Sequence, residues 1–258
     1  STLSSSSAAS DVYKRQRLDQ VLIQTGLAES RHKARALIMA GIVEVDGIKI
    51  DKPGRLIATS ASISVKKSST AYVSRGGLKL EAALKHFPVT VADRVLLDIG
   101  ASTGGFTDCL LQHGAQKVIA VDVGYGQLDW RLRNDSRVKV IEKTNVRNLK
   151  PCHFEESIHG AVIDVSFISL RLVVPPVSDI LSADAFIIAL IKPQFEVGRG
   201  QVGKGGVVRD PDLHQNVIDN LSGFFRDINW TVQGHIESPI LGPKGNREFL
   251  IFLERRAN

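Results

Sequence analysis

The stretch Arg94-Val-Leu-Leu-Asp-Ile-Gly-Ala-Ser-Thr-Gly-Gly-Phe-Thr-Asp108 constrains what this 258-residue chain can fold into. Its apolar part, Val95–Ile99, has the length and the branched residues of a buried parallel strand. A loop of small residues follows, and we expect a helix from about Gly104. Glycines let a backbone turn sharply and approach a ligand, and the first N–H groups of a helix are free to hold one. The stretch therefore predicts a ligand-binding loop, with a glycine-rich turn that binds nothing as the alternative.

A second expected strand, Lys117–Asp122, ends in a carboxylate about 20 residues after the loop. At the tip of a neighbouring strand such an acid binds ribose hydroxyls, as it does in Rossmann dehydrogenases and in S-adenosylmethionine methyltransferases. The loop lacks the G-x-G-x-x-G spacing, which favours the methyltransferase and leaves a Rossmann oxidoreductase as the alternative. We therefore expect S-adenosylmethionine as the cofactor. The residues expected to bind it are Asp98, Gly100, Ser102, Gly104, Gly105, Phe106, Thr107, Asp122, Val123, Asn145, Val146 and Asp164. A side chain at Gly104 is expected to fill the space of the cofactor's methionine part.

The positive charge of the chain is concentrated in its first third. Residues 1–90 hold 14 Lys or Arg and 7 Asp or Glu, although the whole chain carries a formal net charge of only +6. This asymmetry predicts a polyanion-binding module joined to a near-neutral enzyme, with a merely solvated charged face as the alternative.

Cysteine content and hydropathy exclude several other classes of protein. The two cysteines, Cys109 and Cys152, lie in no C-x-x-C motif and beside no histidine pair, so we expect neither a disulfide framework nor a metal site. No run approaches the ~18–20 apolar residues of a membrane span. We expect a cytoplasmic protein that does not associate with a membrane.

The chain before Lys66 is predicted to form a disordered leader and a small domain. Residues 1–16 are rich in serine and have no apolar signal-peptide core, so we expect a disordered leader whose native origin stays open. In residues 17–65, apolar residues at helical spacing predict two helices, the second capped by Ser30 and ending at Gly41. A hairpin turning at Asp46-Gly47 follows, and a strand at Ala61–Val65 closes the domain.

This pattern of two helices and a hairpin resembles the small RNA-binding domain of the fourth small-subunit ribosomal protein. The motifs that carry the resemblance are Arg17-Leu18-Asp19, Ser30-Arg31, Ala34-Arg35 and Val43-x-Val45-Asp46-Gly47. In that family a basic helix face lies against RNA phosphates. The resemblance implies that Arg17, Arg31, Lys33 and Arg35 bind RNA.

Residues 66–72 read as a linker, and residues 73–258 as a methyltransferase domain. Seven expected strands alternate with helices, which predicts an α/β, doubly wound, Rossmann-like sheet. In the methyltransferase order 3-2-1-4-5-7-6, strands four and five end at Asp164 and Lys192, and strand seven begins at Glu248 on the same edge. Lys79, in the first turn of an expected helix before strand one, is placed unfavourably for the helix dipole and asks for a function.

The segment Gly198-Arg-Gly-Gln-Val-Gly-Lys-Gly-Gly206 imitates a phosphate-binding P-loop. It lacks the Ser or Thr that would hold magnesium, and no helix pattern begins there, so we reject nucleoside triphosphate binding. We expect a flexible basic lid over the catalytic crevice, with Arg199 and Lys204 in contact with RNA.

Lys79, Asp164, Lys192 and Glu248 together resemble the Lys-Asp-Lys-Glu tetrad of FtsJ-type RNA ribose 2′-O-methyltransferases. With the RNA-binding domain in front, the chain resembles the TlyA family of ribosomal RNA methyltransferases, long labelled hemolysins. The motifs that carry this resemblance are Tyr72-Val-Ser-Arg-Gly-Gly-Leu-Lys79, Asp98–Asp108, Asp164-Val-Ser-Phe-Ile-Ser-Leu170, Lys192-Pro-Gln-Phe-Glu-Val-Gly198 and Gly245-Asn-Arg-Glu-Phe249. Thr70-Ala-Tyr-Val73 departs from the family's Arg-x-Trp-Val-like linker, which puts any coupling of RNA and cofactor binding through it in doubt.

The resemblance implies that the enzyme methylates cytidine 2′-hydroxyls in ribosomal RNA or ribosomal subunits. The small-subunit RNA is the expected substrate, and the large-subunit RNA is a further candidate. Lys192 is then the base or the alkoxide stabiliser, Asp164 aims it, and Glu248 orients Lys79 or the ribose. A lysine with a pKa of about 10.4 needs a neighbouring charge or desolvation to act as a base, and Lys79 offers that charge. A non-catalytic RNA-binding or ribosome-assembly protein and a pore-forming hemolysin are the alternatives from other classes.

Overall fold

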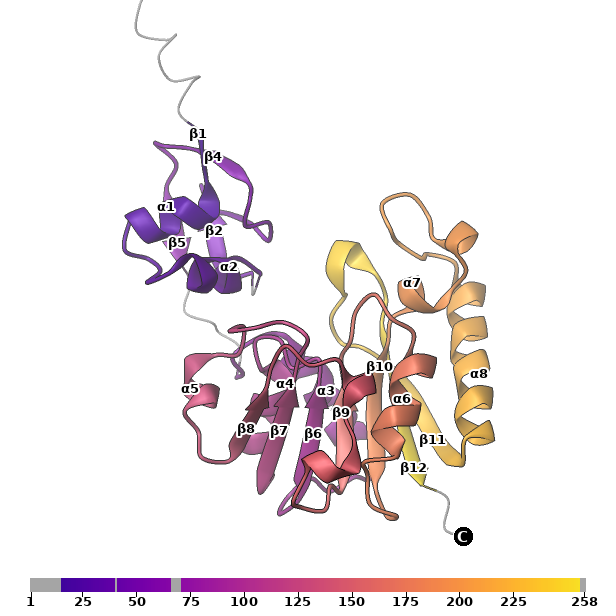
Figure 1. Ribbon diagram of the computed structural model, residues 1–258. Coiled ribbons are helices and arrows are strands. Elements are labelled where there is room, and N and C mark those ends of the chain that lie inside the picture. Colours follow the sequence, from indigo (N-terminus) through magenta and orange to yellow (C-terminus); the bar gives the residue numbers. More distant parts are fainter. Residues whose placement is uncertain (1–14, 40, 66–70, 256–258) are drawn as a thin grey trace, which may run out of the picture. The chain divides into compact units, whose positions relative to one another are not determined.

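The computed structural model describes residues 15–39, 41–65 and 71–255, apart from the side chains of His32 and Arg199. The chain divides into two compact units, Ser1–Ser69 and Thr70–Asn258 (Figure 1). Residues 1–14 of the predicted leader and residues 66–70 of the predicted linker lie outside the described part.

The first unit contains two helices and two small sheets. Strand β2 lies between β3 and β5, and β1 pairs with β4. The interior is formed by apolar residues from both helices and from β2, among them Leu18, Leu22, Ile38 and Val43. The elements are β1 (Arg15–Arg17), α1 (Leu18–Gln24), α2 (Arg31–Met39), β2 (Val43–Val45), β3 (Ile48–Lys49), β4 (Leu56–Ala58) and β5 (Ile63–Val65).

One feature of the first unit differs from the sequence prediction, and another agrees with it. Arg15 and Gln16, assigned to the disordered leader, continue into β1 and pair antiparallel with Ala58 and Ile57 of β4. The hairpin turns where expected, and Asp46 and Gly47 have φ values of 51° and 76°. Two successive positive φ values are typical of the tight hairpin turn that matches the twist of the strands.

The second unit is built on a seven-stranded sheet in the order β11-β12-β10-β9-β6-β7-β8 (Figure 1). Counted along the second unit, this is the predicted order 3-2-1-4-5-7-6. Strand β12 runs antiparallel to both β10 and β11. The strands are β6 (Val95–Ile99), β7 (Lys117–Val121), β8 (Val138–Ile141), β9 (Gly160–Ile163), β10 (Phe186–Ile191), β11 (Trp230–Glu237) and β12 (Phe249–Arg255).

Helices cover both faces of this sheet. Helices α6 and α8 pack on one face through residues such as Val174 and Phe225, and α3 and α4 pack on the other through Leu80 and Leu110. The helices are α3 (Gly76–His86), α4 (Gly105–Gln112), α5 (Trp130–Arg133), α6 (Leu170–Ser178), α7 (Pro193–Glu196) and α8 (Pro211–Asp227). Short 3₁₀ turns are η2 (Val146–Asn148), η3 (Pro151–His153), η4 (Arg199–Gln201) and η5 (Pro243–Gly245).

The predicted linker is wrong at its end, because Tyr72 is only 4% exposed and belongs to the core under α3 and α4. A Cβ at Gly77 would lie 2.4 Å from the Tyr72 ring, so this aromatic ring requires a glycine on the facing helix. Tyr72 therefore packs as part of the second unit. Within the part of the chain that is described, no helix has the length and apolarity to span a membrane.

Candidate active site

The candidate catalytic residues meet at one edge of the sheet. Asp164 and Lys192 directly follow the parallel strands β9 and β10. Strand β12 runs the other way and begins at this edge, where Ile191 pairs with Phe249. Continuing that register by one residue places Glu248 beside Lys192.

The four predicted catalytic residues form two ion pairs. Lys192 Nζ lies 2.6 Å from Asp164 Oδ1 and donates a hydrogen bond of 2.9 Å to Ser166 Oγ. Lys79 Nζ, from the first turn of α3, lies 2.5 Å from Glu248 Oε2. The side chains of Lys79, Lys192 and Asp164 are 10%, 9% and 22% exposed, and that of Glu248 is fully buried. The edge thus holds two cations and two anions at low exposure.

Glu248 keeps one oxygen free. Among the described residues, its Oε1 is buried and has no hydrogen-bond partner. A Cβ at Gly242 would lie 2.0 Å from this oxygen, so only a glycine fits behind the carboxylate. A buried carboxylate oxygen without a donor is costly unless a ligand supplies one.

The glycine loop between β6 and α4 adjoins the same site. Gly100 has a φ of +86°, and a Cβ there would lie 2.4 Å from the carbonyl oxygen of Asp164. Asp122, at the tip of β7, accepts hydrogen bonds from the N–H groups of Ser102 (2.8 Å) and Gly124 (2.6 Å). Each carboxylate oxygen has two acceptor positions, so both bonds leave room for a ligand hydroxyl. Asp122 therefore shapes the loop and still presents acceptors.

Packing against neighbouring side chains explains why the next two glycines of the loop, Gly104 and Gly105, carry no side chain. A Cβ at Gly104 would lie 2.3 Å from Leu132 and 2.8 Å from Leu128, and one at Gly105 would lie 2.3 Å from Ser74 Oγ. The expectation that a side chain at Gly104 fills cofactor space is wrong, because its missing side chain points at packed leucines. Both glycines allow α4 to begin close to its neighbours.

Several other predicted cofactor residues point into the core. Phe106, Thr107 and Val146 are 3%, 0% and 7% exposed, so these residues pack in the interior of the second unit. Asn145 accepts a hydrogen bond from the N–H of Arg147. Val123, by contrast, is 70% exposed beside Asp122.

Asp98 is fully buried below the glycine loop. Its Oδ2 accepts a hydrogen bond of 2.6 Å from Thr107 Oγ1, and its Oδ1 has no partner among the described residues. Burial raises the pKa of Asp98 to about 7. Asp98, Asp122 and Asp164 gather around the loop, which suits a ligand that carries positive charge.

In the first unit, two of the predicted RNA-binding arginines are held by a buried acid. Asp19 is fully buried and accepts hydrogen bonds from Arg17 Nε and Nη2 (3.0 and 2.9 Å) and from Arg31 Nε (3.2 Å). These guanidinium groups hold the pKa of Asp19 below its ordinary value, since the Arg17 hydrogen bonds outweigh its burial. Arg35 is exposed and Lys33 half-buried. The resemblance flagged Asp19 as part of a motif, but its sequence context does not reveal this structural role.

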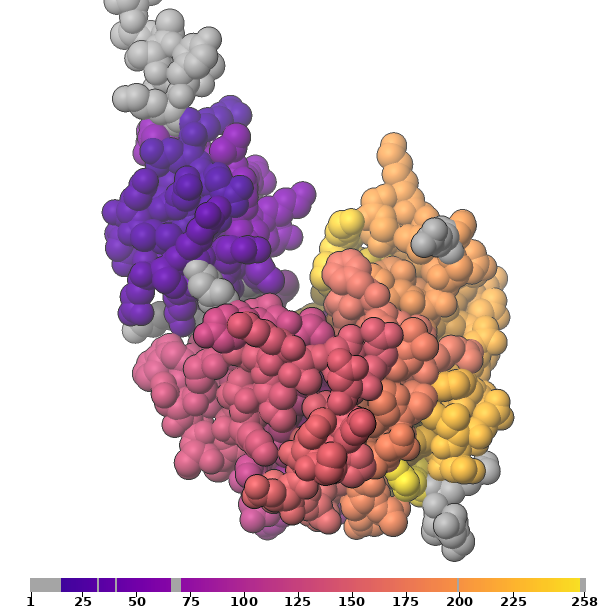
Figure 2. All heavy atoms as spheres, viewed as in Figure 1, coloured from indigo at the N-terminus to yellow at the C-terminus, as the bar shows by residue number. Residues whose placement is uncertain are grey.

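The glycine-rich segment after α7 is a turn held by a neighbouring segment. Gly203 and Val207 form a β-bridge, and the tip, which carries exposed Lys204, projects from the second unit (Figure 2). Asn246 is 2% exposed; its Oδ1 accepts from the N–H of Val208, and its Nδ2 donates to the carbonyl of Gly206. The predicted contact residue Arg199 has its backbone in η4, and its side chain lies outside the described part.

Sequence reasoning missed three residues of the loops around Lys192. Ser166 bonds Lys192, and Glu196 binds the start of α6. Phe167 is 90% exposed, has a φ of +65° and lies 4.9 Å from the Phe195 ring between ring centroids. An exposed aromatic face next to Asp164 offers a surface on which a nucleic-acid base can stack. All three residues lie within a few positions of Asp164 or Lys192 in the sequence, and this closeness could have indicated that they belong to the site.

The fold and this edge define a class, the Rossmann-like methyltransferases. Residues 72–255 match the model of the FtsJ-like methyltransferase family, and residues 16–63 match the S4 domain. The chain therefore belongs to the FtsJ-like methyltransferase family. This confirms the predicted enzyme class, the fold class with its small N-terminal RNA-binding domain, and S-adenosylmethionine as the cofactor.

Relatives share both parts of the chain. TlyA of Mycobacterium tuberculosis, named a 16S/23S rRNA (cytidine-2′-O)-methyltransferase, is 47% identical over 95% of this chain and 92% of its own length. YqxC of Bacillus subtilis, named as a candidate rRNA methyltransferase, is 51% identical over 93% of this chain and 86% of its own length. A solved structure from Streptococcus thermophilus, described as a candidate hemolysin, is 45% identical with a TM-score of 0.74 over 95% of this chain and 90% of that one.

Proposed function

We propose that this chain is an S-adenosylmethionine-dependent methyltransferase that methylates the 2′-hydroxyl of cytidine in ribosomal RNA. The observation that carries the proposal is the pairing of Lys192 with Asp164 and of Lys79 with Glu248, side by side at the strand edge next to the glycine loop. The substrate is that of the curated relative TlyA, with which the chain shares nearly its whole length. Both small-subunit and large-subunit RNA are candidate substrates, and the site of action is the cytoplasm.

The residues around the glycine loop fit the cofactor. S-adenosylmethionine supplies an electrophilic methyl group on a positively charged sulfur. Asp122 would accept from its ribose hydroxyls, and exposed Val123 would border its adenine. The carboxylate of Asp164 would stabilise the positive charge of the sulfur, and Asp98 Oδ1 is buried below the loop without a partner among the described residues.

Lys192 is placed to hold the attacking ribose oxygen. An ammonium group has three N–H donors; Asp164 and Ser166 take two of them, and the third is free for O2′. Lys192 would stabilise O2′ as this oxygen takes the methyl group, with the electron pair of the broken C–S bond left on the cofactor's sulfur, and would pass the proton released from O2′ on to Asp164. Glu248 fixes Lys79 through Oε2, and its Oε1 stays buried without a donor among the described residues. Much of the rate comes from holding the two substrates in line.

The first unit supplies affinity for the RNA. Its exposed or half-buried cations, Arg17, Arg31, Lys33 and Arg35, and the exposed Lys204 of the second unit suit phosphate oxygens. Arg17 and Arg31 keep exposed fractions of 42% and 58% although both bond Asp19. The arginine pair is therefore pre-ordered by a buried carboxylate.

The proposal is tested by transfer of a labelled methyl group to ribosomal RNA and subunits, with the modified nucleotide mapped by nuclease digestion and mass spectrometry. The wild-type protein should produce 2′-O-methylcytidine, and Lys192→Ala should abolish it while S-adenosylmethionine affinity stays within about threefold. Loss from the single-turnover rate with affinity retained identifies a role in the chemical step. RNA binding by a wild-type protein that labels no RNA would instead support the non-catalytic alternative.

Lys192→Arg separates proton transfer from simple charge. A guanidinium stays protonated and is flat and wider than an ammonium, and the Lys192 side chain, which bonds Asp164 and Ser166, is only 9% exposed. The variant should therefore be nearly as inactive as Lys192→Ala. Retention of most of the wild-type rate would contradict proton transfer at Nζ and leave electrostatic stabilisation as the role of this residue.

A further inference from the structure

The helix that follows Lys192 is too short to be stable by itself. Helix α7 has four residues, Pro193–Glu196, and Lys192 is its N-cap. Isolated helices shorter than about 12 residues are marginal in water. The position of α7, and with it the direction of Lys192, must therefore be set by contacts to other elements.

Glu196, the last residue of α7, makes such a contact with both of its oxygens. Ser169 Oγ–H donates to Oε2 at 2.6 Å, and the N–H of Leu170 donates to Oε1 at 2.8 Å. Leu170 is the first residue of α6 and Ser169 is its N-cap. A carboxylate is favoured at a helix N-terminus, where free N–H groups and the helix dipole are positive. Although burial raises the pKa of Glu196, these two hydrogen bonds counteract the shift.

The loop before α6 carries the partners of Lys192. Asp164 and Ser166 bond Lys192 at one end of the contact, and Glu196 binds Ser169 and Leu170 at the other. Between them the rings of Phe167 and Phe195 pack with centroids 4.9 Å apart. Residues 164–170 and 192–196 are thus joined along their whole length, and Glu196 forms the anchor farthest from the reacting edge.

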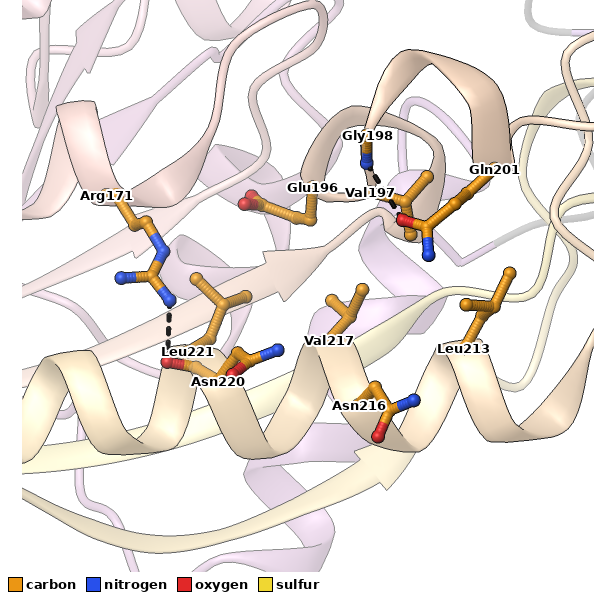
Figure 3. A pocket seen from close by; sticks show the side chains of 10 residues that line it. All are labelled: Arg171, Glu196, Val197, Gly198, Gln201, Leu213, Asn216, Val217, Asn220 and Leu221. Atoms are coloured by element: carbon orange, nitrogen blue, oxygen red, sulfur yellow. Dashed lines mark hydrogen bonds between the residues drawn. The ribbon is translucent and has the colours of Figure 1, made fainter.

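Open space lies on another side of α7. A pocket of about 280 Å³ separates the segment Glu196–Gln201 from α8 and is lined by Arg171, Leu213, Asn216 and Asn220 among others (Figure 3). Arg171 spans one end by donating to the carbonyl of Asn220. Helix α7 also contacts α8 beside this pocket, but the pocket leaves this side incompletely packed, so the bonds of Glu196 to the start of α6 add to what holds α7 in place.

We infer that Glu196 is a positioning residue for the methyl-transfer reaction, which holds Lys192 against Asp164 and Ser166 by tying α7 to the start of α6. The inference rests on the proposed function. A misplacement of about 1 Å in a catalytic group can cost about 100-fold in rate. Glu196→Ala is therefore expected to lower the single-turnover rate of methyl transfer about 10- to 100-fold, with the dissociation constants of S-adenosylmethionine and RNA within about threefold of wild type.

Two further variants separate positioning from general damage. Glu196→Gln keeps the shape, since its amide oxygen can accept from Leu170 and its amide nitrogen can donate to Ser169 Oγ; it should restore the rate to within about fivefold of wild type. Ser178→Ala is the matched control, because Ser178 Oγ accepts from Trp230 Nε1 at the opposite end of α6. This control removes one anchor of the same helix and should leave the rate nearly unchanged.

Hydrogen exchange gives a readout that does not depend on activity. In Glu196→Ala the amides of residues 169–171 and 194–197 should exchange faster, whereas those of β9 and β10 should not. An unchanged rate in Glu196→Ala, equal losses in Glu196→Ala and Ser178→Ala, or unchanged exchange at these amides would each overturn the inference. A wild-type protein that transfers no methyl group to ribosomal RNA would overturn the proposed function. Hydrogen exchange would then still show whether Glu196 anchors α7.

Discussion

Removal of one partner of the Lys79–Glu248 ion pair is expected to destabilise the second unit strongly, because the remaining partner stays charged in a buried place. The Lys79 side chain is 10% exposed and that of Glu248 is not exposed at all. Breaking a buried pair from one side typically costs about 3–5 kcal/mol. Glu248→Ala leaves the ammonium without its anion, and Lys79→Ala leaves a buried carboxylate without its cation.

The double variant Lys79→Ala/Glu248→Ala removes both charges and should cost much less than the two single changes together. What remains is the loss of packing around the lysine methylenes and the glutamate side chain. Groups in direct contact show coupling energies of about 0.5–3 kcal/mol, and a charged pair with an N–O distance of 2.5 Å belongs at the upper end of that range. We expect a coupling of about 2–3 kcal/mol.

Urea unfolding followed by tryptophan fluorescence measures these energies in the full chain. The chain's two tryptophans, Trp130 and Trp230, both lie in the second unit, so the signal reports on that unit. At about 2–4 °C per kcal/mol, each single variant should also lower the melting temperature by about 6–20 °C. The reasoning is refuted if the single variants unfold within about 1 kcal/mol of wild type, or if their costs simply add in the double variant.

Three further predictions concern other parts of the molecule. Burial raises the pKa of Asp98 to about 7, whereas an unfolded aspartate ionises near 3.9. Between about pH 4 and 7 the folded state therefore holds a proton that the unfolded state has lost. The free energy of unfolding should fall as the pH rises through this range, by up to about 1.4 kcal/mol per pH unit. Asp98→Asn should lack this decline in urea titrations at pH 5, 6 and 7, and a parallel decline in both proteins would exclude Asp98 as its source. Asp122→Asn replaces one acceptor oxygen by a donor facing the N–H groups of Ser102 or Gly124, so calorimetry should show at least about tenfold weaker S-adenosylmethionine binding. Arg35→Glu reverses the charge of an exposed cation of α2, so it should weaken the binding of ribosomal RNA and reduce the dependence of that binding on salt. The affinity for the cofactor should stay unchanged and serves as the internal control. An unaltered salt dependence would show that Arg35 does not contact RNA.

The sheet could be predicted because several of its strands are short apolar runs with a charged residue of the candidate site at their carboxyl end. Asp98, Asp122, Asp164 and Lys192 each mark such a strand end. Once the order of parallel strands is known, their carboxyl ends must meet at one edge. Strand order and the meeting of the four tetrad residues therefore follow from local sequence together with one topology.

Side-chain direction and partner choice were not predictable in the same way. The glycines of Gly100–Gly105 look alike in sequence, yet Gly100 faces Asp164 while Gly104 faces Leu128 and Leu132. Helix α6 does not read as a helix in the sequence, because Pro175 and Pro176 lie in its interior, where a proline removes a backbone hydrogen bond and disfavours the helix. Helix α8 begins at Pro211, because Asp210 caps it and Pro211 occupies its first position.

The two ion pairs also bear on how Lys192 can act. Asp164 Oδ1 lies 2.6 Å from Lys192 Nζ and accepts from one of its three N–H donors. Lys79 is unlike a free neighbouring cation, since Glu248 already holds its charge at 2.5 Å. The sequence-based hypothesis that Lys79 supplies the field that frees Lys192 to act as a base therefore loses force. A charged Lys192 that donates to O2′, with Asp164 beside it to receive the proton, needs no such field, and it explains why each lysine of this edge has its own carboxylate.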